Sequence, residues 1–376
     1  MKKIFILLFL FLFLFTGNAN AIYDPASVPN NKVGVHILFP TELDKAKELV
    51  NSNGGDWGYV TIPIQSGDKD LRKWQEFMDN CKKLHLIPLV RLATHGDYFE
   101  TTTWKKPQDD DIVDFANFLN SLDWPTKNRY IIVYNEVNRA DEWQGQANPS
   151  EYARILSYAV TVFKSKNQDF FIISSGMDNA SVTANGTYNQ FDFFSFMNGE
   201  VPGIFNQIDG ISSHSYPNPG FSQPPDVLTP RSISSYQYEL AEIANYSNKE
   251  LPVFITETGW SQDAVSKELA GKYLVQAFNE VWNDPQVVAV TPFLLTAGGG
   301  PFEQFSLTTP SHEKNEVFKE LEALPKTLGA PKLSPVRKVL GQEKDGIFPV
   351  KNFSHHAVNQ IGEGAKAIVK LLFLGF

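Results

Sequence analysis

Eight short apolar segments recur along the chain between residues 33 and 295, and segments with helical periodicity separate them. Each apolar segment is rich in Val, Ile, Phe and Tyr and is almost continuous in hydrophobic residues. Such runs are typical of parallel strands that are covered on both faces. The expected strands are Val33–Leu38, Trp57–Ile64, Leu86–Leu92, Arg129–Glu136, Phe170–Gly176, Gln207–His214, Leu251–Glu257 and Val287–Leu295.

The segments between these strands place apolar residues on one helical face. The clearest stripe, between the second and third strands, consists of Leu71, Trp74, Phe77, Met78, Cys81 and Leu84. We expect another helix to begin at Thr41, where Asp44 completes a start that resembles a capping box. Further helices are expected after Pro149 and, with a weaker pattern, around Tyr188–Met197.

Eight strand–helix repeats in a little over 300 residues predict a fold of the α/β class, a single-domain (β/α)8 TIM barrel. The alternative is a doubly wound open sheet. That fold usually carries a glycine-rich phosphate loop after its first strand, and no such loop follows Val33–Leu38. We therefore assign residues 22–327 to a barrel domain.

Both ends of the chain have a different composition. Lys2 and Lys3 precede an apolar run, and Ala19-Asn20-Ala21 follows it, which predicts a signal peptide over residues 1–21 and a secreted protein. Residues 328–376 are interpreted as a linker and tail with a short apolar segment near the end. We expect no stable membrane span in the mature chain, because neither apolar run reaches the roughly 20 residues needed.

Composition narrows the range of partners. The net charge of −9 argues against nucleic acid and against an anionic membrane surface, and it favours a neutral substrate. Cys81 is the single cysteine, so no internal disulfide can form, and its place in the apolar helical stripe predicts a core residue. We expect a monomer that needs no cofactor.

In a barrel, the carboxyl ends of the strands and the loops after them form the active face. Polar residues that end an apolar strand are therefore informative. The fourth strand runs into Asn135-Glu136, and the seventh ends in Thr256-Glu257. Two carboxylates that face each other across such a mouth are what glycoside hydrolysis requires, one as proton donor and one on the opposite side of the anomeric carbon.

Three motifs in order along the chain extend this pattern: Asn135-Glu136, His214-x-Tyr216 and Thr256-Glu257-x-Gly259-Trp260. Together they resemble the clan A glycoside hydrolases, which are retaining (β/α)8 enzymes. The resemblance covers nearly the whole expected barrel, from Val33 to about Ala323. It implies cleavage of O-glycosidic bonds, most simply β bonds, of an extracellular poly- or oligosaccharide by a two-step retaining mechanism.

The resemblance also implies individual roles. The glutamate after the asparagine is the acid/base in that clan and the glutamate of strand seven is the nucleophile, which correspond to Glu136 and Glu257. The asparagine commonly binds the sugar 2-hydroxyl, the role implied for Asn135. His214 and Tyr216 resemble the pair from strand six that supports the two carboxylates.

Three further residues complete the expected substrate site. Arg91 ends the third strand, and it could keep the nucleophile ionised. His36 lies in the first strand, and the ring of Trp260 could stack on a sugar. A zinc site of His36, His95 and His214 is the alternative for the histidines, but no close carboxylate–histidine spacing accompanies them, and we expect no metal.

The sequence departs from the clan at strand eight, where many members carry a tryptophan. No tryptophan occurs in residues 291–300, and Phe293, Phe302 or Phe305 could take its place. The sugar, the linkage and the specific family therefore stay open. Two alternative functions also remain: a catalytically silent barrel that binds glycans, and a transglycosidase that uses the same residues.

Overall fold

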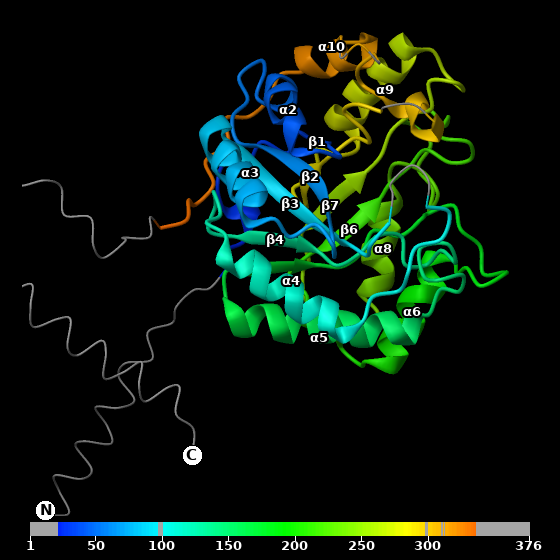
Figure 1. The fold of residues 1–376 in the computed structure, drawn as a ribbon. Helices are drawn as coiled ribbons and strands as arrows, with labels where there is room; N and C mark the ends of the chain where they lie inside the picture. Colours follow the sequence, from blue (N-terminus) through cyan, green and yellow to red (C-terminus); the bar gives the residue numbers. More distant parts are fainter. Residues whose placement is uncertain (1–21, 97–100, 298–299, 310, 312, 336–376) are drawn as a thin grey trace, which may run out of the picture. The chain divides into compact units, whose positions relative to one another are not determined.

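All eight predicted strands form, and they run parallel to one another. The computed structural model describes residues 22–96, 101–297, 300–309, 311 and 313–335 (Figure 1). The strands are β1 (Gly34–His36), β2 (Gly58–Gln65), β3 (Leu86–Ala93), β4 (Arg129–Ile132), β5 (Phe170–Ile173), β6 (Ile211–His214), β7 (Val253–Glu257) and β8 (Val287–Val290).

The strands divide into two parallel sheets, β1-β2-β3-β4-β5 and β6-β7-β8. Isolated parallel bridges connect the sheets at both of their edges, Val33 with Val290 and Ile173 with Gly210. Gly34 permits the close approach of β1 to β8, because a Cβ at this position would lie 2.6 Å from Cγ2 of Thr291. The two sheets are therefore in contact through their edge strands.

Alternate residues of the strands face a shared interior. One buried cluster combines side chains of both sheets, and it consists of Trp57, Tyr59, Ile87, Leu89, Tyr130, Ile132, Phe171, Ile173, Phe254, Val288 and Ala289. The intervening residues, such as Ile131 and Ile172, belong to the larger core under the helices. Almost every residue of the strands is buried. This burial on both faces explains why the strands are nearly continuous in apolar residues.

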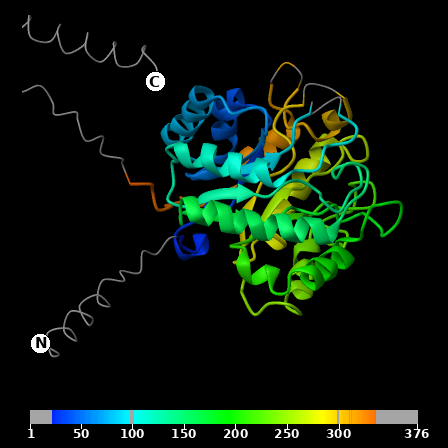
Figure 2. The same ribbon diagram turned by 60° about the horizontal axis from the view of Figure 1, so that its bottom comes forward.

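The helices lie outside the strands in both views (Figure 1 and Figure 2). The α-helices are α2 (Leu43–Val50), α3 (Leu71–Leu84), α4 (Asp109–Ser121), α5 (Pro149–Lys166), α6 (Gln190–Glu200), α7 (Ile204–Gln207), α8 (Ser235–Ile243), α9 (Lys267–Glu280) and α10 (Glu316–Ala323). Three short 3-10 helices, η1 (Pro25–Ser27), η2 (Pro40–Glu42) and η3 (Gly300–Phe305), occur in the connections. The predicted stripe of α3 is buried from Trp74 to Cys81, which confirms Cys81 as a core residue.

Several element boundaries differ from the expectation. Thr41 does not begin the first helix; it lies inside η2, where the Glu42 carboxylate accepts hydrogen bonds from the backbone N–H groups of Leu38 and Phe39. The strand β4 ends at Ile132, so Glu136 lies four residues beyond it. The sixth strand begins at Ile211, because the preceding residues form the helical turn α7.

The two ends of the chain are only partly described. Residues 1–21 and 336–376, which include the predicted signal peptide and most of the predicted tail, lie outside the described residues. The start of the predicted linker contacts the preceding domain, since Leu328 pairs with Asp56 and Leu333 with Thr126. Among the described helices, none combines the length and the hydropathy that a membrane crossing requires.

Candidate active site

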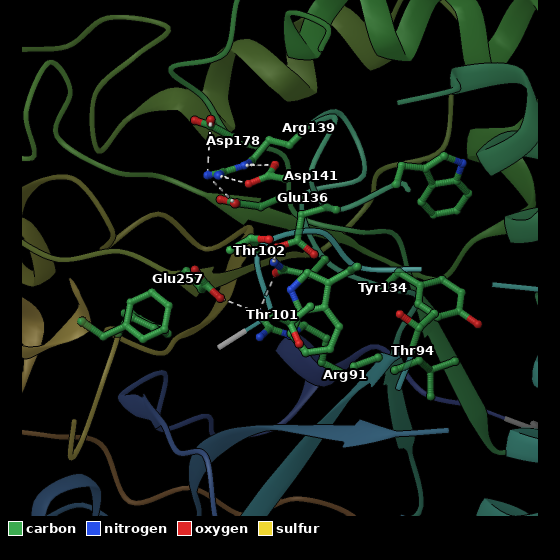
Figure 3. A pocket seen from close by; sticks show the side chains of 18 of the residues that line it. Arg91, Thr94, Thr101, Thr102, Tyr134, Glu136, Arg139, Asp141, Asp178 and Glu257 are labelled. Carbon is green, nitrogen blue, oxygen red and sulfur yellow. Dashed lines mark hydrogen bonds and ion pairs between the residues drawn. The ribbon is translucent and has the colours of Figure 1, made fainter. Parts of the chain in front are cut away.

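A cavity of about 360 Å³ lies at the carboxyl-terminal side of the strands, between the loops that follow them (Figure 3). This is the face at which parallel α/β folds of this kind hold their active sites. The cavity brings together five residues that the sequence predicted: Arg91, Asn135, Glu136, Tyr216 and Glu257.

The loop after β4 carries Asn135 and Glu136 into this cavity. Tyr134 and Glu136 both adopt left-handed backbone conformations, with φ of 69° and 35°. Residues other than glycine rarely adopt such angles, and they concentrate at functional sites. The N–H of Glu136 bonds to the carbonyl of Gly176 at 3.0 Å, which ties the turn to the segment after β5.

Glu257 ends β7 and is surrounded by hydrogen-bond donors. Arg91 donates to its Oε1, and the hydroxyl of Tyr216 donates to its Oε2 at 3.1 Å. Nδ1 of His214 lies 3.7 Å from the same Oε2. Burial favours the neutral acid, but the charges of His214 and Arg91 outweigh it and hold the pKa of Glu257 below its usual range. Glu257 is therefore an ionised carboxylate at neutral pH.

Glu136 approaches the same ring nitrogen of His214 as Glu257 does. Nδ1 of His214 lies 3.0 Å from Oε1 of Glu136, and Arg139 donates to the other oxygen at 3.3 Å. One oxygen of each carboxylate and a nitrogen of His214 all lie within 4.8 Å of one another. The two acids thus converge on one small volume.

His214 is fully buried and lies against Gly176. A Cβ at residue 176 would lie 2.2 Å from Cδ2 of the imidazole, so only glycine leaves room for this ring. Burial disfavours the imidazolium, but the carboxylates of Glu257 and Glu136 outweigh it and raise the pKa of His214. The ring therefore forms a hydrogen bond with Glu136, and when protonated it places a positive charge beside Glu257.

Three of the predicted substrate-binding residues do not line the cavity: His214, which lies behind the two acids, and also His36 and Trp260. His36 is fully buried beneath Glu257, with Nε2 3.7 Å from Oε1 of that residue, and burial followed by the charge of Arg91 lowers the pKa of His36 to about 3. Trp260 packs against Tyr273 and Trp282, and its indole N–H donates to a backbone carbonyl. Neither His36 nor Trp260 is placed to touch a ligand in the cavity.

Five charged residues of the cavity were not selected from the sequence: Lys105, Arg139, Asp141, Glu142 and Asp178. Arg139 forms a two-bond ion pair with Asp141 and lies 4.0 Å from Asp178 (Figure 3). Three of the five, Arg139, Asp141 and Glu142, follow Asn135-Glu136 in the same loop. Their position after a strand that leads into the predicted catalytic motif was the available indication.

The opposite wall of the cavity is aromatic. Phe293, which follows β8 where many clan members have tryptophan, packs edge-on against His36, Phe302 and Phe305. Tyr216 and Phe221 continue this wall. A rigid apolar surface of this kind suits the C–H faces of a sugar ring. The cavity therefore has a charged wall and an apolar wall.

The described residues contain one group that could hold a metal ion, namely Glu136, His214 and Glu257. Two guanidinium groups already accompany these acids, Arg91 at Glu257 and Arg139 at Glu136. A divalent cation would have to displace or tolerate both positive charges at close range. The donor set therefore fits proton transfer and carboxylate chemistry better than metal ligation.

Beneath β6, a further acid is fully buried. Glu239 accepts a hydrogen bond from Ser213 at 2.8 Å, and its Oε2 has no partner among the described residues. Burial outweighs the serine hydrogen bonds and raises the pKa of Glu239 to about 7. The folded protein therefore holds this carboxyl protonated over a pH range in which the unfolded chain ionises it.

This shift predicts a pH-dependent stability. The free energy of unfolding should decrease from about pH 4.5 to 7 by on the order of 2–3 kcal/mol through Glu239, because only the unfolded state releases the proton there. In Glu239→Gln this contribution to the slope of unfolding free energy against pH should vanish. Urea unfolding at a series of pH values measures the slope. An unchanged slope in the variant would contradict the assignment.

Comparisons with known proteins agree with this architecture. No protein-family model matches the sequence, and no curated protein does. Among solved structures, a family 39 glycoside hydrolase from Bacteroides cellulosilyticus WH2 is similar with a TM-score of 0.56 and 16% identity over 81% of this chain. The match spans 65% of that protein's own length.

Two further structures are similar at the same level. An endo-β-1,3-glucanase of family GH128 from Sorangium cellulosum has a TM-score of 0.52 and 15% identity, over 78% of this chain and 98% of its own. An exo-β-1,4-mannosidase from Opitutaceae bacterium strain TAV5 has a TM-score of 0.57 and 13% identity, over 83% and 62%. At such identities the similarity shows that this chain has the α/β fold of these glycoside hydrolases. It does not identify a substrate for this chain.

Proposed function

We propose that the protein is a retaining glycoside hydrolase whose eight strands close into one (β/α)8 barrel. The bridges between the sheet edges and the interior cluster shared by both sheets support the closed barrel. The observation that best supports the function is that Glu136 and Glu257 line one cavity at the carboxyl ends of the strands and converge with His214 within 4.8 Å.

The separation of the acids supports the retaining mechanism. Retaining enzymes hold their two carboxyl groups about 5–5.5 Å apart, whereas inverting enzymes need roughly 6.5–9.5 Å to admit a water. One oxygen of Glu136 and one of Glu257 lie within 4.8 Å of each other, and this close approach supports the retaining mechanism over the inverting one. Glu257 would therefore attack the anomeric carbon itself.

In the first step, Glu257 is the nucleophile and Glu136 the proton donor. Arg91 and Tyr216 hold one oxygen each of Glu257, so the carboxylate is ionised and fixed in direction. As it bonds to the anomeric carbon, Glu136 transfers its proton to the departing glycosidic oxygen. The second N–H of Asn135 is available to the sugar 2-hydroxyl, since its Oδ1 accepts from Arg91 and its other N–H donates to Glu142.

In the second step, water cleaves the glycosyl-enzyme. Glu136 has given its proton to the departing oxygen, so it is now a carboxylate beside the neutral ester of Glu257. Glu136 then takes the proton of the attacking water, and Glu257 departs as the carboxylate that Arg91 stabilises. The two displacements restore the original anomeric configuration.

The experiment that tests this function is trapping with a panel of activated fluoro-glycosides, followed by peptide mass mapping. We expect a covalent label on Glu257 with one or a few of the sugars, which would establish the mechanism and name the glycon together. A label on another residue would contradict the mechanism. Turnover of glycans without any labelled intermediate in the entire panel would contradict it as well.

We also propose that the protein is exported and acts on an extracellular carbohydrate as a monomer. Tyr23 is buried and exchanges hydrogen bonds with Asn128 at 3.1 and 2.8 Å, which supports a mature chain that begins just before it. Expression in a secreting host should yield a mature protein starting at Ile22, which N-terminal sequencing checks. An uncleaved chain would contradict the signal peptide.

A further inference from the structure

Glu142 lines the cavity six residues after the proposed acid/base, and the mechanism above gives it no chemical role. Its Oε1 accepts a hydrogen bond from Nδ2 of Asn135 at 3.1 Å. No cation lies within ion-pair distance of it in the described part of the chain. A salt bridge therefore does not explain why a carboxyl group occupies this position in the cavity.

The contact with Asn135 fixes the orientation of that amide. Oδ1 of Asn135 accepts from Arg91 at 2.7 Å, while one N–H donates to Glu142. A carboxamide has one oxygen and two N–H donors, so a partner on each side determines which end faces which neighbour. The remaining N–H of Asn135 is then the group offered to a ligand, and Glu142 lies directly beside it.

The protonation state of Glu142 depends on its burial and on the charges around it. Burial, and next the charge of Glu136, raise the pKa of Glu142 to about 8. At neutral pH its carbonyl oxygen can accept from Asn135 while its O–H remains a donor; once ionised, it only accepts. The titratable and charged groups that face it are Glu136, Arg91 and Arg139.

We propose that Glu142 is a specificity-determining residue, which orients the amide of Asn135 and donates a hydrogen bond to a hydroxyl group of the sugar bound beside Asn135. The inference rests on the proposed glycosidase function and deepens it. It assigns a neutral sugar to this position, because the cations that act on Glu142, Arg91 and Arg139, are each paired with protein carboxylates.

The test uses two variants of the full chain and one control. Glu142→Gln keeps the size, the acceptor for Asn135 and a donor for the sugar, but it cannot ionise. Glu142→Leu removes every hydrogen bond. Glu200→Gln makes the same substitution in an exposed residue at the end of α6, away from the cavity. The substrate is the aryl glycoside of the sugar that labels Glu257 in the wild type.

KM and kcat are measured for each protein between pH 5 and 9.5. For the wild type and Glu200→Gln, KM should rise as the pH passes about 8, because ionised Glu142 loses its donor. For Glu142→Gln, KM should stay constant through that range. For Glu142→Leu, kcat/KM at pH 6 should fall by about 10- to 100-fold, the range for one lost hydrogen bond to a ligand.

The outcomes distinguish a failure of the proposed glycosidase function from a failure of the role proposed for Glu142. A wild type that acquires no label on Glu257 overturns the glycosidase function, and this inference with it. A labelled wild type overturns this inference alone if Glu142→Gln keeps the rise of KM above pH 8, or if a folded Glu142→Leu retains wild-type kcat/KM. Should Glu142→Leu fail to fold, the pH profile of Glu142→Gln decides.

Discussion

Replacing Glu257 by glutamine is expected to lower kcat by on the order of 10⁴- to 10⁶-fold, the scale on which a lost nucleophile acts. Glutamine has nearly the same shape, its oxygen can still accept from Arg91, and its N–H can donate to the hydroxyl of Tyr216, so the cavity should keep its form. The amide cannot form the glycosyl ester. Steady-state turnover of an activated aryl glycoside measures the loss.

The matched control is Glu250→Gln, the same change in an exposed residue just before β7. It should retain wild-type kcat. A Glu257→Gln protein that is folded by circular dichroism and keeps more than a tenth of wild-type kcat would overturn the assignment of the nucleophile.

The product formed with azide gives a second test of Glu257. In Glu257→Ala the missing side chain leaves space on the nucleophile's side of the anomeric carbon. Azide should occupy it and displace the aryl group in a single step, which yields a glycosyl azide of inverted configuration. NMR of the product identifies the anomer.

The strands and the pair of acids could be predicted because burial leaves a strong pattern. Strands covered on both faces must be apolar along their length, so polar residues such as Asn135 and Glu257 stand out where each strand stops. The order of these strands then brings both acids to the same face of the fold. This reasoning needs no side-chain geometry, and it located the centre of the cavity.

How deeply a side chain is buried and which way it points could not be predicted from the sequence, because both depend on where each strand stops. The strand β1 ends at His36, not at Leu38, and the histidine lies buried beneath Glu257 instead of at the mouth. Trp260 follows a glycine with φ of 152°, and its ring is directed toward α9 rather than toward the cavity. Neither backbone feature has a pattern in the sequence.

The charged wall was missed for a related reason. Arg139 reaches Glu136 because the loop after β4 turns through left-handed residues and returns along the cavity. A loop sequence rich in Arg, Asp and Glu is equally typical of a solvated surface. Only the three-dimensional course of the chain separates the two interpretations.

Replacing Glu136 by alanine should produce a loss that depends on the leaving group. For a substrate with a poor leaving group, such as an alkyl or sugar aglycone, kcat/KM should fall by about 10²- to 10⁴-fold, the usual contribution of a general acid. For a dinitrophenyl glycoside, whose leaving group needs no proton, kcat/KM should remain within about tenfold of the wild type. Kinetics with both substrates test this contrast.

The azide product also distinguishes the role of Glu136 from that of Glu257. In Glu136→Ala the glycosyl-enzyme on Glu257 still forms from the activated substrate, but water attacks it slowly without a base. Azide needs no base and should raise kcat, and because it attacks after one inversion has already occurred, its product keeps the substrate's configuration. This is the opposite anomer to that expected from Glu257→Ala. If both variants gave the same anomer, or if Glu136→Ala lost activity equally on both classes of leaving group, Glu136 would not be the acid/base.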